Sequence, residues 1–298
     1  MIINDVRERG NEMEINCIKD RRNEGDTTLR QTQLTQLYLL EVFDAICKEY
    51  GIEYFLTCGT LLGALRHKGF IPWDDDLDVG MTRRQYRRFL NVAPKCLPRN
   101  IMLQTPSSVP GAFSHFGKLR DLSSLFVESE SNMTEPSGIF IDIFPYDKMP
   151  QLPPKLAHLW LRGISTCWRK SRWHRVSAHR NAITMLWGAM CSAAWATLRV
   201  ILRLCGVLFM WLPRRWHCEP EIGGISAIER GIPDEEIWPL AEAEFEGRKF
   251  PVPCNSDAVL TRYYGAWREF PPENERQGHH SHLVFPMQSM GFWWAVKR

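Results

Sequence analysis

Four aspartates crowd into five positions of the segment YFLTCGTLLGALRHKGFIPWDDDLDVGM, which spans residues 54–81. Asp74, Asp75, Asp76 and Asp78 would repel one another without a nearby cation, because neighbouring like charges raise one another's pKa values. Clustered carboxylate oxygens suit a hard cation such as Mg²⁺ or Mn²⁺ better than zinc. The cluster therefore indicates a divalent-metal site, and the alternative is an acidic loop that faces solvent.

The alternation of apolar and acidic residues gives these aspartates different roles. A single leucine separates Asp76 from Asp78, so a strand here would point both carboxylates to one face. Two carboxylates on one strand face can hold one ion, and we therefore predict Asp76 and Asp78 as metal ligands. Asp74 is a candidate general base, because the adjacent Trp73 could raise its pKa. Asp75 is expected to point away.

A small-residue turn lies upstream of the acidic cluster. Residues 52–56 are typical of a buried strand, and Gly59-Thr60 then turns the chain into a short helix. The backbone N–H groups and dipole at the start of a helix favour a phosphate, which a metal on the next strand would also contact. The alternative is an ordinary strand-to-helix turn.

Asp142 is a charged residue inside the apolar run GIFIDIF, residues 138–144. Such a short continuous apolar run is typical of a central strand. A buried charge is costly unless it is paired or bound to a metal. We therefore predict Asp142 as a third metal ligand or a general base, and the alternative is an ion pair with an arginine.

The run GTLLGALRHKGFIPWDDDLDVGM resembles the core of the LicD family of phosphocholine and related phospho-group transferases. This family includes the fukutin-related proteins and belongs to the nucleotidyltransferase-fold superfamily. The superfamily pattern is Gly-Ser, then Asp-apolar-Asp, then a third carboxylate on a later strand; here Thr60 replaces the serine and Asp142 is the third carboxylate. Residues 140–145 and 264–279 resemble the second and closing blocks, so the resemblance covers roughly residues 34–280.

The resemblance implies an α+β fold, with a nucleotidyltransferase-like mixed sheet flanked by helices. It also implies a transferase dependent on Mg²⁺ or Mn²⁺ that moves phosphocholine, or a related phospho-substituent, from a CDP-linked donor. The acceptor would be a hydroxyl of a cell-surface glycan, such as lipopolysaccharide or teichoic acid, or of its lipid-linked precursor. Three alternatives stay open: transfer of the nucleotide itself, a glycosyltransferase that binds metal through Asp-x-Asp, and a non-enzymatic scaffold.

Several residues are predicted to contact the donor. Lys118 and Arg120 lie two apart in a predicted hairpin over residues 115–127, which places them on one strand face. The resemblance to the family's closing block implies that Arg276 and His279 contact the donor phosphates. Choline, if it is the transferred group, would need aromatic side chains around its quaternary ammonium. The predicted phosphate-binding set is Gly59, Thr60, Arg66, Lys68, Lys118, Arg120, Arg276 and His279, with Phe70 and Trp73 as head-group contacts. Packing or exposure to solvent is the alternative for each.

The positions of apolar residues predict the elements that hold these side chains. A helix begins near Leu34, a second covers residues 83–92 and ends at Pro94 and Pro98, and a third covers residues 257–264 and ends at Gly265. We divide the chain into a polar N-terminal segment (1–30), a catalytic core (31–150), a helical insertion (151–218) and a part that completes the catalytic domain (219–298).

The insertion is strongly basic and rich in tryptophan. Residues 151–218 contain eleven Lys and Arg but no Asp or Glu, and hold seven of the twelve tryptophans of a chain whose net charge is +3. Basic residues interleaved with tryptophan suit a lipid headgroup layer, and nucleic acid is the disfavoured alternative. Residues 182–198 carry no charge but are too short to cross a bilayer. We predict a hairpin over residues 182–212 at the membrane surface; a tilted span and a buried helical pair are the alternatives.

The remaining composition bears on location. The N-terminal 30 residues lack the basic start and apolar stretch of a signal peptide, which predicts a cytoplasmic protein, peripheral at the inner face of the membrane. Nine cysteines without a CxxC pair fit neither a zinc site nor a disulfide scaffold, so we expect reduced thiols.

Overall fold

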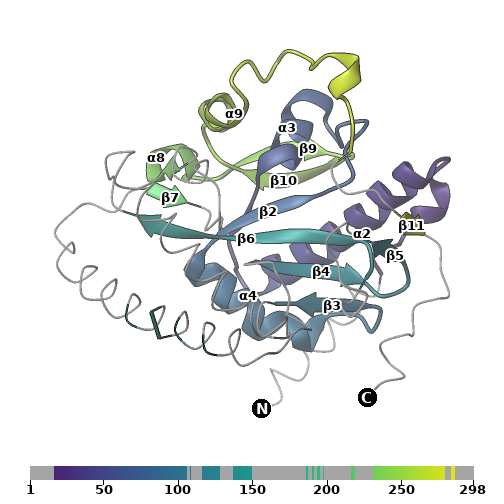
Figure 1. Ribbon diagram of the computed structural model, residues 1–298, viewed down its shortest axis with the longest axis horizontal. Helices are drawn as coiled ribbons and strands as arrows, with labels where there is room; N and C mark the ends of the chain where they lie inside the picture. The colour runs from purple at the N-terminus through teal and green to yellow at the C-terminus, as the bar shows by residue number, and fades with distance from the viewer. Residues whose placement is uncertain are drawn as a thin grey trace.

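The computed structural model describes residues 17–105, 108, 116–127, 137–149, 186, 190, 193–194, 197, 216–218, 231–278 and 283–285. Its centre is a mixed sheet in the order β1-β2-β6-β4-β3 (Figure 1). The strands are β1 (Phe55–Leu56), β2 (Asp78–Thr82), β6 (Phe140–Met149), β4 (Gly117–Asp121) and β3 (Ile101–Gln104). Only the β2–β6 pair among these is parallel. The predicted α+β class, with a mixed sheet flanked by helices, is confirmed.

Two helices cover one face of this sheet. They are α2 (Thr28–Glu49) and α4 (Arg83–Cys96), and the rings of Phe43 and Phe89 join them at a centroid distance of 4.7 Å. Each helix begins at a threonine whose hydroxyl accepts a hydrogen bond from a backbone N–H of the first turn. Because side chains alternate along a strand, Val79, Ile143 and Leu119 point into this apolar layer and their neighbours point to the opposite face.

The second group of elements gathers at the β2 side of the sheet, where Figure 1 shows α3, the β9–β10 hairpin and α9 above β2. These are α3 (Cys58–His67), β9 (Ala241–Phe245), β10 (Arg248–Val252) and α9 (Ser256–Tyr264). Glu246, at the hairpin tip, accepts a hydrogen bond from the backbone N–H of Phe70 and pairs with Arg30 at 2.6 Å. The hairpin thus anchors the loop between α3 and β2.

Smaller elements complete the described part. The end of β6 pairs with β7 (Trp216–Cys218), and β7 pairs with β8 (Ile232–Pro233). The short helix α8 (Asp234–Ile237) follows β8. Two 3-10 turns, η1 (Arg22–Glu24) and η3 (Glu273–Glu275), flank the fold. Arg22 is buried and pairs with Asp121 at 2.7 Å, so η1 is attached to the end of β4.

The predicted hairpin over residues 115–127 is wrong. In the sheet β4 lies between β6 and β3, so neither of its edges is available to β5 (Leu125–Val127). β5 therefore pairs with β11 (Leu283–Phe285) instead. Of the two prolines predicted to end the second helix, Pro94 lies inside its last turn, whereas the helix does end at Cys96, just before Pro98. The third helix ends as predicted, at Gly265, whose φ is +63°.

The insertion of residues 151–218 lies almost entirely outside the described residues, as does the predicted membrane hairpin over residues 182–212 except for isolated positions. The domain boundaries accordingly stay a prediction. Within the described ranges, none of the helices combines the length and apolar character that a bilayer span needs.

Candidate functional site

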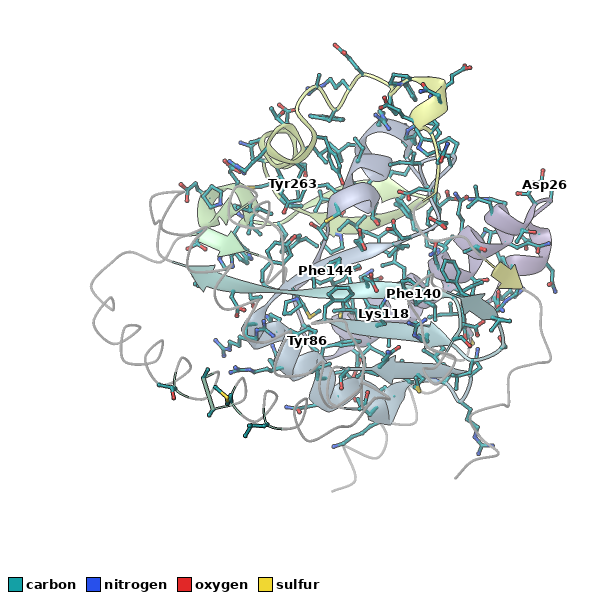
Figure 2. The ribbon with its side chains drawn as sticks, in the orientation of Figure 1. Asp26, Tyr86, Lys118, Phe140, Phe144 and Tyr263 are labelled. Carbon is teal, nitrogen blue, oxygen red and sulfur yellow. The ribbon has the colours of Figure 1, made fainter. Side chains whose placement is uncertain are left out.

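Three charged side chains, which we call the carboxylate row, lie across the middle of the sheet, on the face opposite α2 and α4. Asp78 of β2 lies beside Asp142 of β6, which in turn lies beside Lys118 of β4. All three are buried, and the Lys118 ammonium lies 3.2 Å from Oδ1 of Asp142. It also lies 3.5 Å from the ring centroid of Phe140, and Figure 2 shows these two side chains adjacent in the sheet. The strand register therefore joins residues that are distant in sequence.

The acidic loop before β2 is held in place by two glutamines of α2. The side-chain amide of Gln33 donates to the carbonyl of Asp74 at 2.9 Å, and that of Gln36 donates to the carbonyl of Asp75 at 2.7 Å. Gln36 also donates to the carbonyl of Phe140, at the start of β6. The sequence analysis did not predict either residue. Two glutamines three positions apart among the apolar residues of one helix could have indicated them.

The Gly59-Thr60 turn packs directly against the aspartates. A side chain at position 59 would bring a Cβ atom within 2.9 Å of Oδ2 of Asp74, so it would displace this carboxylate. The Thr60 hydroxyl accepts a hydrogen bond from the Asp78 N–H at 2.7 Å. The start of α3 is therefore fixed to the start of β2.

Asp76 and Asp78 lie on either side of a strand boundary. β2 begins at Asp78, so Asp76 lies in the loop just before it, where Asp74 interacts with it through its side chain. Pairing with β6 extends one residue back toward Asp76, because the N–H of Asp142 donates to the carbonyl of Leu77 at 2.8 Å. That Asp76 and Asp78 present their carboxylates to one face stays a prediction. Asp75 is buried, and its carboxylate lies against Gly278 of the C-terminal segment.

Burial dominates the electrostatics of the acidic loop. It raises the pKa of Asp74 to about 6, while the side-chain contact with Asp76 and hydrogen bonds from the backbone of Asp75 and Asp76 lower it. Burial therefore brings the pKa of Asp74 close to the neutral range.

A pocket of about 400 Å³ opens beside Asp74. Its wall combines the start of α3, the acidic loop and the segment after α9. The lining residues are Gly59, Leu62, Arg66, Ile71, Trp73, Asp74, Tyr264, Ala266, Trp267, Glu269, Phe270 and Pro271. The pocket therefore adjoins the predicted catalytic carboxylates.

Two arginines meet at this pocket. Arg66 donates to the backbone carbonyls of Trp267 and Glu269, and its guanidinium lies 4.8 Å from the ring centroid of Phe270. Arg276 stacks over Trp73 at 5.3 Å. Arg276 also lies 5.6 Å from the centroid of Phe270, so the two cations contact the same ring. Burial and then the charge of Arg276 lower the pKa of Arg66. Neighbouring guanidinium groups beside a pocket suit a phosphate.

The structure places other predicted contacts away from this pocket. Lys68 ends α3 in a left-handed conformation, with a side chain that is 72% exposed. Arg120 is buried and bonded to Gln104 and to the carbonyl of Gly138. Phe70 packs against Phe245 in the core and does not line the pocket. His279 lies outside the described residues.

The donor set suits one hard cation. Among the residues that the structure describes, no three His, Cys, Asp or Glu side chains converge as a ready-made metal cage. Asp78 and Asp142 nevertheless present two buried carboxylates side by side on adjacent strands. Mg²⁺ is commonly held by one or two carboxylates, with water and substrate phosphates as its other ligands. The pair therefore fits Mg²⁺, and Asp76 stays a predicted third ligand.

Residues 51–171 match the family described as LicD/FKTN/FKRP, nucleotidyltransferase domain. This range holds the Gly-Thr turn, the acidic loop and strands β2, β4 and β6, so the fold and the carboxylate row belong to a nucleotidyltransferase-type domain.

Similarity to individual proteins extends further. Lipopolysaccharide cholinephosphotransferase LicD of Haemophilus influenzae is 32% identical over 268 residues, which are 85% of this chain and 96% of that protein. The ribitol 5-phosphate transferases FKRP of human and mouse are 43% identical over 53 residues, which are 18% of this chain and 10% of each relative. The chain belongs to the LicD family and is a phosphotransferase of that type. The predicted relation to the fukutin-related proteins is confirmed.

Proposed function

We propose that this chain transfers phosphocholine from a CDP-linked donor to a hydroxyl group of a cell-surface glycan, with Mg²⁺ or Mn²⁺ as cofactor. The observation that carries the proposal is the likeness to the Haemophilus influenzae cholinephosphotransferase, which extends over 96% of that protein. The relative named for ribitol 5-phosphate matches only 18% of this chain. Phosphocholine is therefore favoured over ribitol phosphate.

Asp78 and Asp142 would hold the metal. When bound, the ion would neutralise charge on the donor diphosphate and stabilise the departing CMP. The N–H groups at the start of α3, next to Gly59 and Thr60, favour the same phosphates. Arg66 and Arg276 lie at the pocket, where they would bind the remaining phosphate oxygens.

Asp74 is the proposed general base. The acceptor oxygen attacks the phosphorus that carries choline, its proton passes to the Asp74 carboxylate, and the bond to the oxygen of CMP breaks. A base is most effective when its pKa lies near the working pH, and burial raises the pKa of Asp74 to about 6. Asp142, the other candidate, is paired with Lys118 at 3.2 Å, which favours its charged form and a role as ligand.

The alternative within this fold is transfer of the nucleotide. Attack at the phosphorus next to choline releases CMP, whereas attack at the phosphorus next to cytidine releases phosphocholine. Purified protein with Mg²⁺ and a panel of CDP-choline, CDP-ribitol and CDP-glycerol distinguishes these reactions. We expect CMP from CDP-choline above all. Release of phosphocholine, or a clear preference for a polyol donor, would overturn the proposal.

A lipid-linked acceptor and peripheral contact with the membrane are also part of the proposal. Their support is the sequence of residues 151–218, which carries eleven basic and no acidic residues. An enzyme held at a membrane surface would meet an acceptor that is anchored there.

A further inference from the structure

Four aromatic side chains surround the pocket beside Asp74: Trp73, Tyr264, Trp267 and Phe270. Two of them are unusually exposed for large rings, with 55% of Phe270 and 42% of Tyr264 accessible to solvent. Exposed aromatic residues that gather around a hollow mark ligand-binding sites more often than they mark packing. The pocket therefore presents ring surface to a ligand.

The rings are held in fixed positions. The indole N–H of Trp267 donates to Asp257 at 3.1 Å, and the imidazole of His67 packs edge-on against Phe270 at 5.6 Å and Trp73 at 6.4 Å. Arg66 stacks on Phe270 and is tied to two backbone carbonyls. A pre-organised site of this kind loses little entropy on binding.

The charges of the pocket suit a zwitterion. Asp74 and Glu269 line it together with the aromatic rings and Arg66. Arg276 adds a second positive charge beside it, over the rings of Trp73 and Phe270. Ring faces and carboxylates attract an ammonium group, whereas a guanidinium attracts a phosphate.

We propose that this aromatic pocket binds the quaternary ammonium of the transferred phosphocholine and so selects the donor; the inference rests on the proposed function. Trp73 and Phe270 are the rings that contact the ammonium, and Arg66 lies by its phosphate. Phe70, the other ring considered for this role, is buried elsewhere against Phe245.

A carbon isostere of the donor provides the test. In CDP-3,3-dimethylbutanol a neutral carbon replaces the choline nitrogen, so shape is kept and charge is lost. Calorimetric titration of the full-length protein with Mg²⁺ would compare this compound, CDP-choline and CMP. We expect CDP-choline to bind about tenfold more tightly than the isostere, because a desolvated cation over aromatic rings gains about that much.

The variants Trp73→Leu and Phe270→Leu separate the pocket from the rest of the site. Each should reduce the preference for CDP-choline over the isostere to about twofold or less, while the affinity for CMP stays unchanged. Phe270 is largely exposed, so its replacement carries little risk to folding. Tyr50→Leu, at an exposed ring that does not line the pocket, is the matched control and should keep the preference.

Two results would overturn the inference. Equal binding of CDP-choline and the isostere by the parent protein would exclude recognition of the cation. Loss of CMP affinity in Trp73→Leu and Phe270→Leu would assign the rings to the cytosine base. Either result leaves the proposed function standing if the same preparation releases CMP from CDP-choline, whereas failure of that release would contradict the proposed function itself.

Discussion

Lys118 is the counter-ion of the carboxylate row. Its ammonium lies 3.2 Å from Asp142 and 3.5 Å from the Phe140 ring, with the lysine and both carboxylates of the row buried. Without a positive charge at this position, Asp78 and Asp142 would face each other across adjacent strands in a poorly solvated environment. The lysine therefore stabilises the protein before a metal ion binds.

This role predicts the effect of Lys118→Met. Breaking a buried ion pair leaves a charge without compensation, so the free energy of unfolding in EDTA should fall by about 3 kcal/mol. The double variant Lys118→Met/Asp142→Asn removes the stranded charge and should regain most of this loss. Urea unfolding monitored by tryptophan fluorescence measures both. A single variant as stable as the parent, or a double variant no better than the single one, would contradict the assignment.

Asp74 links pH to stability. Its pKa is raised from 3.8 to about 6 by burial, so the folded protein holds this proton more tightly than the unfolded chain does. Stability is therefore lost as pH rises from about 4 to about 6, and the penalty is complete above that window.

Asp74→Asn should remove this penalty. In EDTA, the variant should be more stable than the parent by about 3 kcal/mol at pH 7.5, because each pKa unit corresponds to about 1.4 kcal/mol. The difference should vanish near pH 4, where the parent carries a proton at this position. Urea unfolding at the two pH values is the measurement, and an advantage that is equal at both would show that titration of Asp74 is not its cause.

At the scale of elements, Thr60 joins α3 to β2. Its hydroxyl accepts the hydrogen bond of the Asp78 N–H at 2.7 Å, in a buried position. Thr60→Val keeps the shape but leaves this N–H unsatisfied, which should cost about 1–3 kcal/mol of unfolding free energy. Thr60→Ser keeps the hydroxyl and should regain most of the loss. Equal stability of the two variants would show that the hydrogen bond has no net effect.

The sequence predicted some elements well and others poorly, for physical reasons. The apolar period after Leu34 and the glycine after Tyr264 act locally, and α2 and α9 follow from them. The neighbours of β4 depend on contacts between segments distant in sequence, so local alternation suggested a hairpin with β5 that does not exist.

The site likewise combines features that local sequence predicts with features that depend on contacts between distant segments. The acidic cluster and Asp142 stand out as charges in an apolar sequence, and the sheet brings Asp78 and Asp142 together. The pairing of Lys118 with Asp142 requires the strand register, which no local pattern gives. The aromatic pocket forms only because the segment after α9 folds back over Trp73. The number and spacing of aromatic residues in the sequence do not predict this contact.

At the scale of the whole molecule, the basic insertion predicts attraction to anionic membranes. Eleven positive charges without an acidic residue should bind the full chain to vesicles that contain anionic lipid, and not to neutral vesicles. Raising salt from about 0.05 to about 0.5 M should weaken this binding, because salt screens exposed charges. Sedimentation with vesicles is the measurement. The variant Arg199→Glu/Arg203→Glu should bind less, and equal binding to neutral vesicles would contradict an electrostatic contact.

The central claim is that Asp142 serves phosphocholine transfer at the carboxylate row. The most direct measurement follows CMP release and the incorporation of labelled choline into a glycan acceptor, with the parent protein and with Asp142→Asn. The parent should release CMP in step with incorporation, and the variant should lose about a thousandfold in kcat, because it lacks a charged ligand for the metal. An Asp142→Asn variant that keeps more than about a tenth of the parent rate would contradict the account.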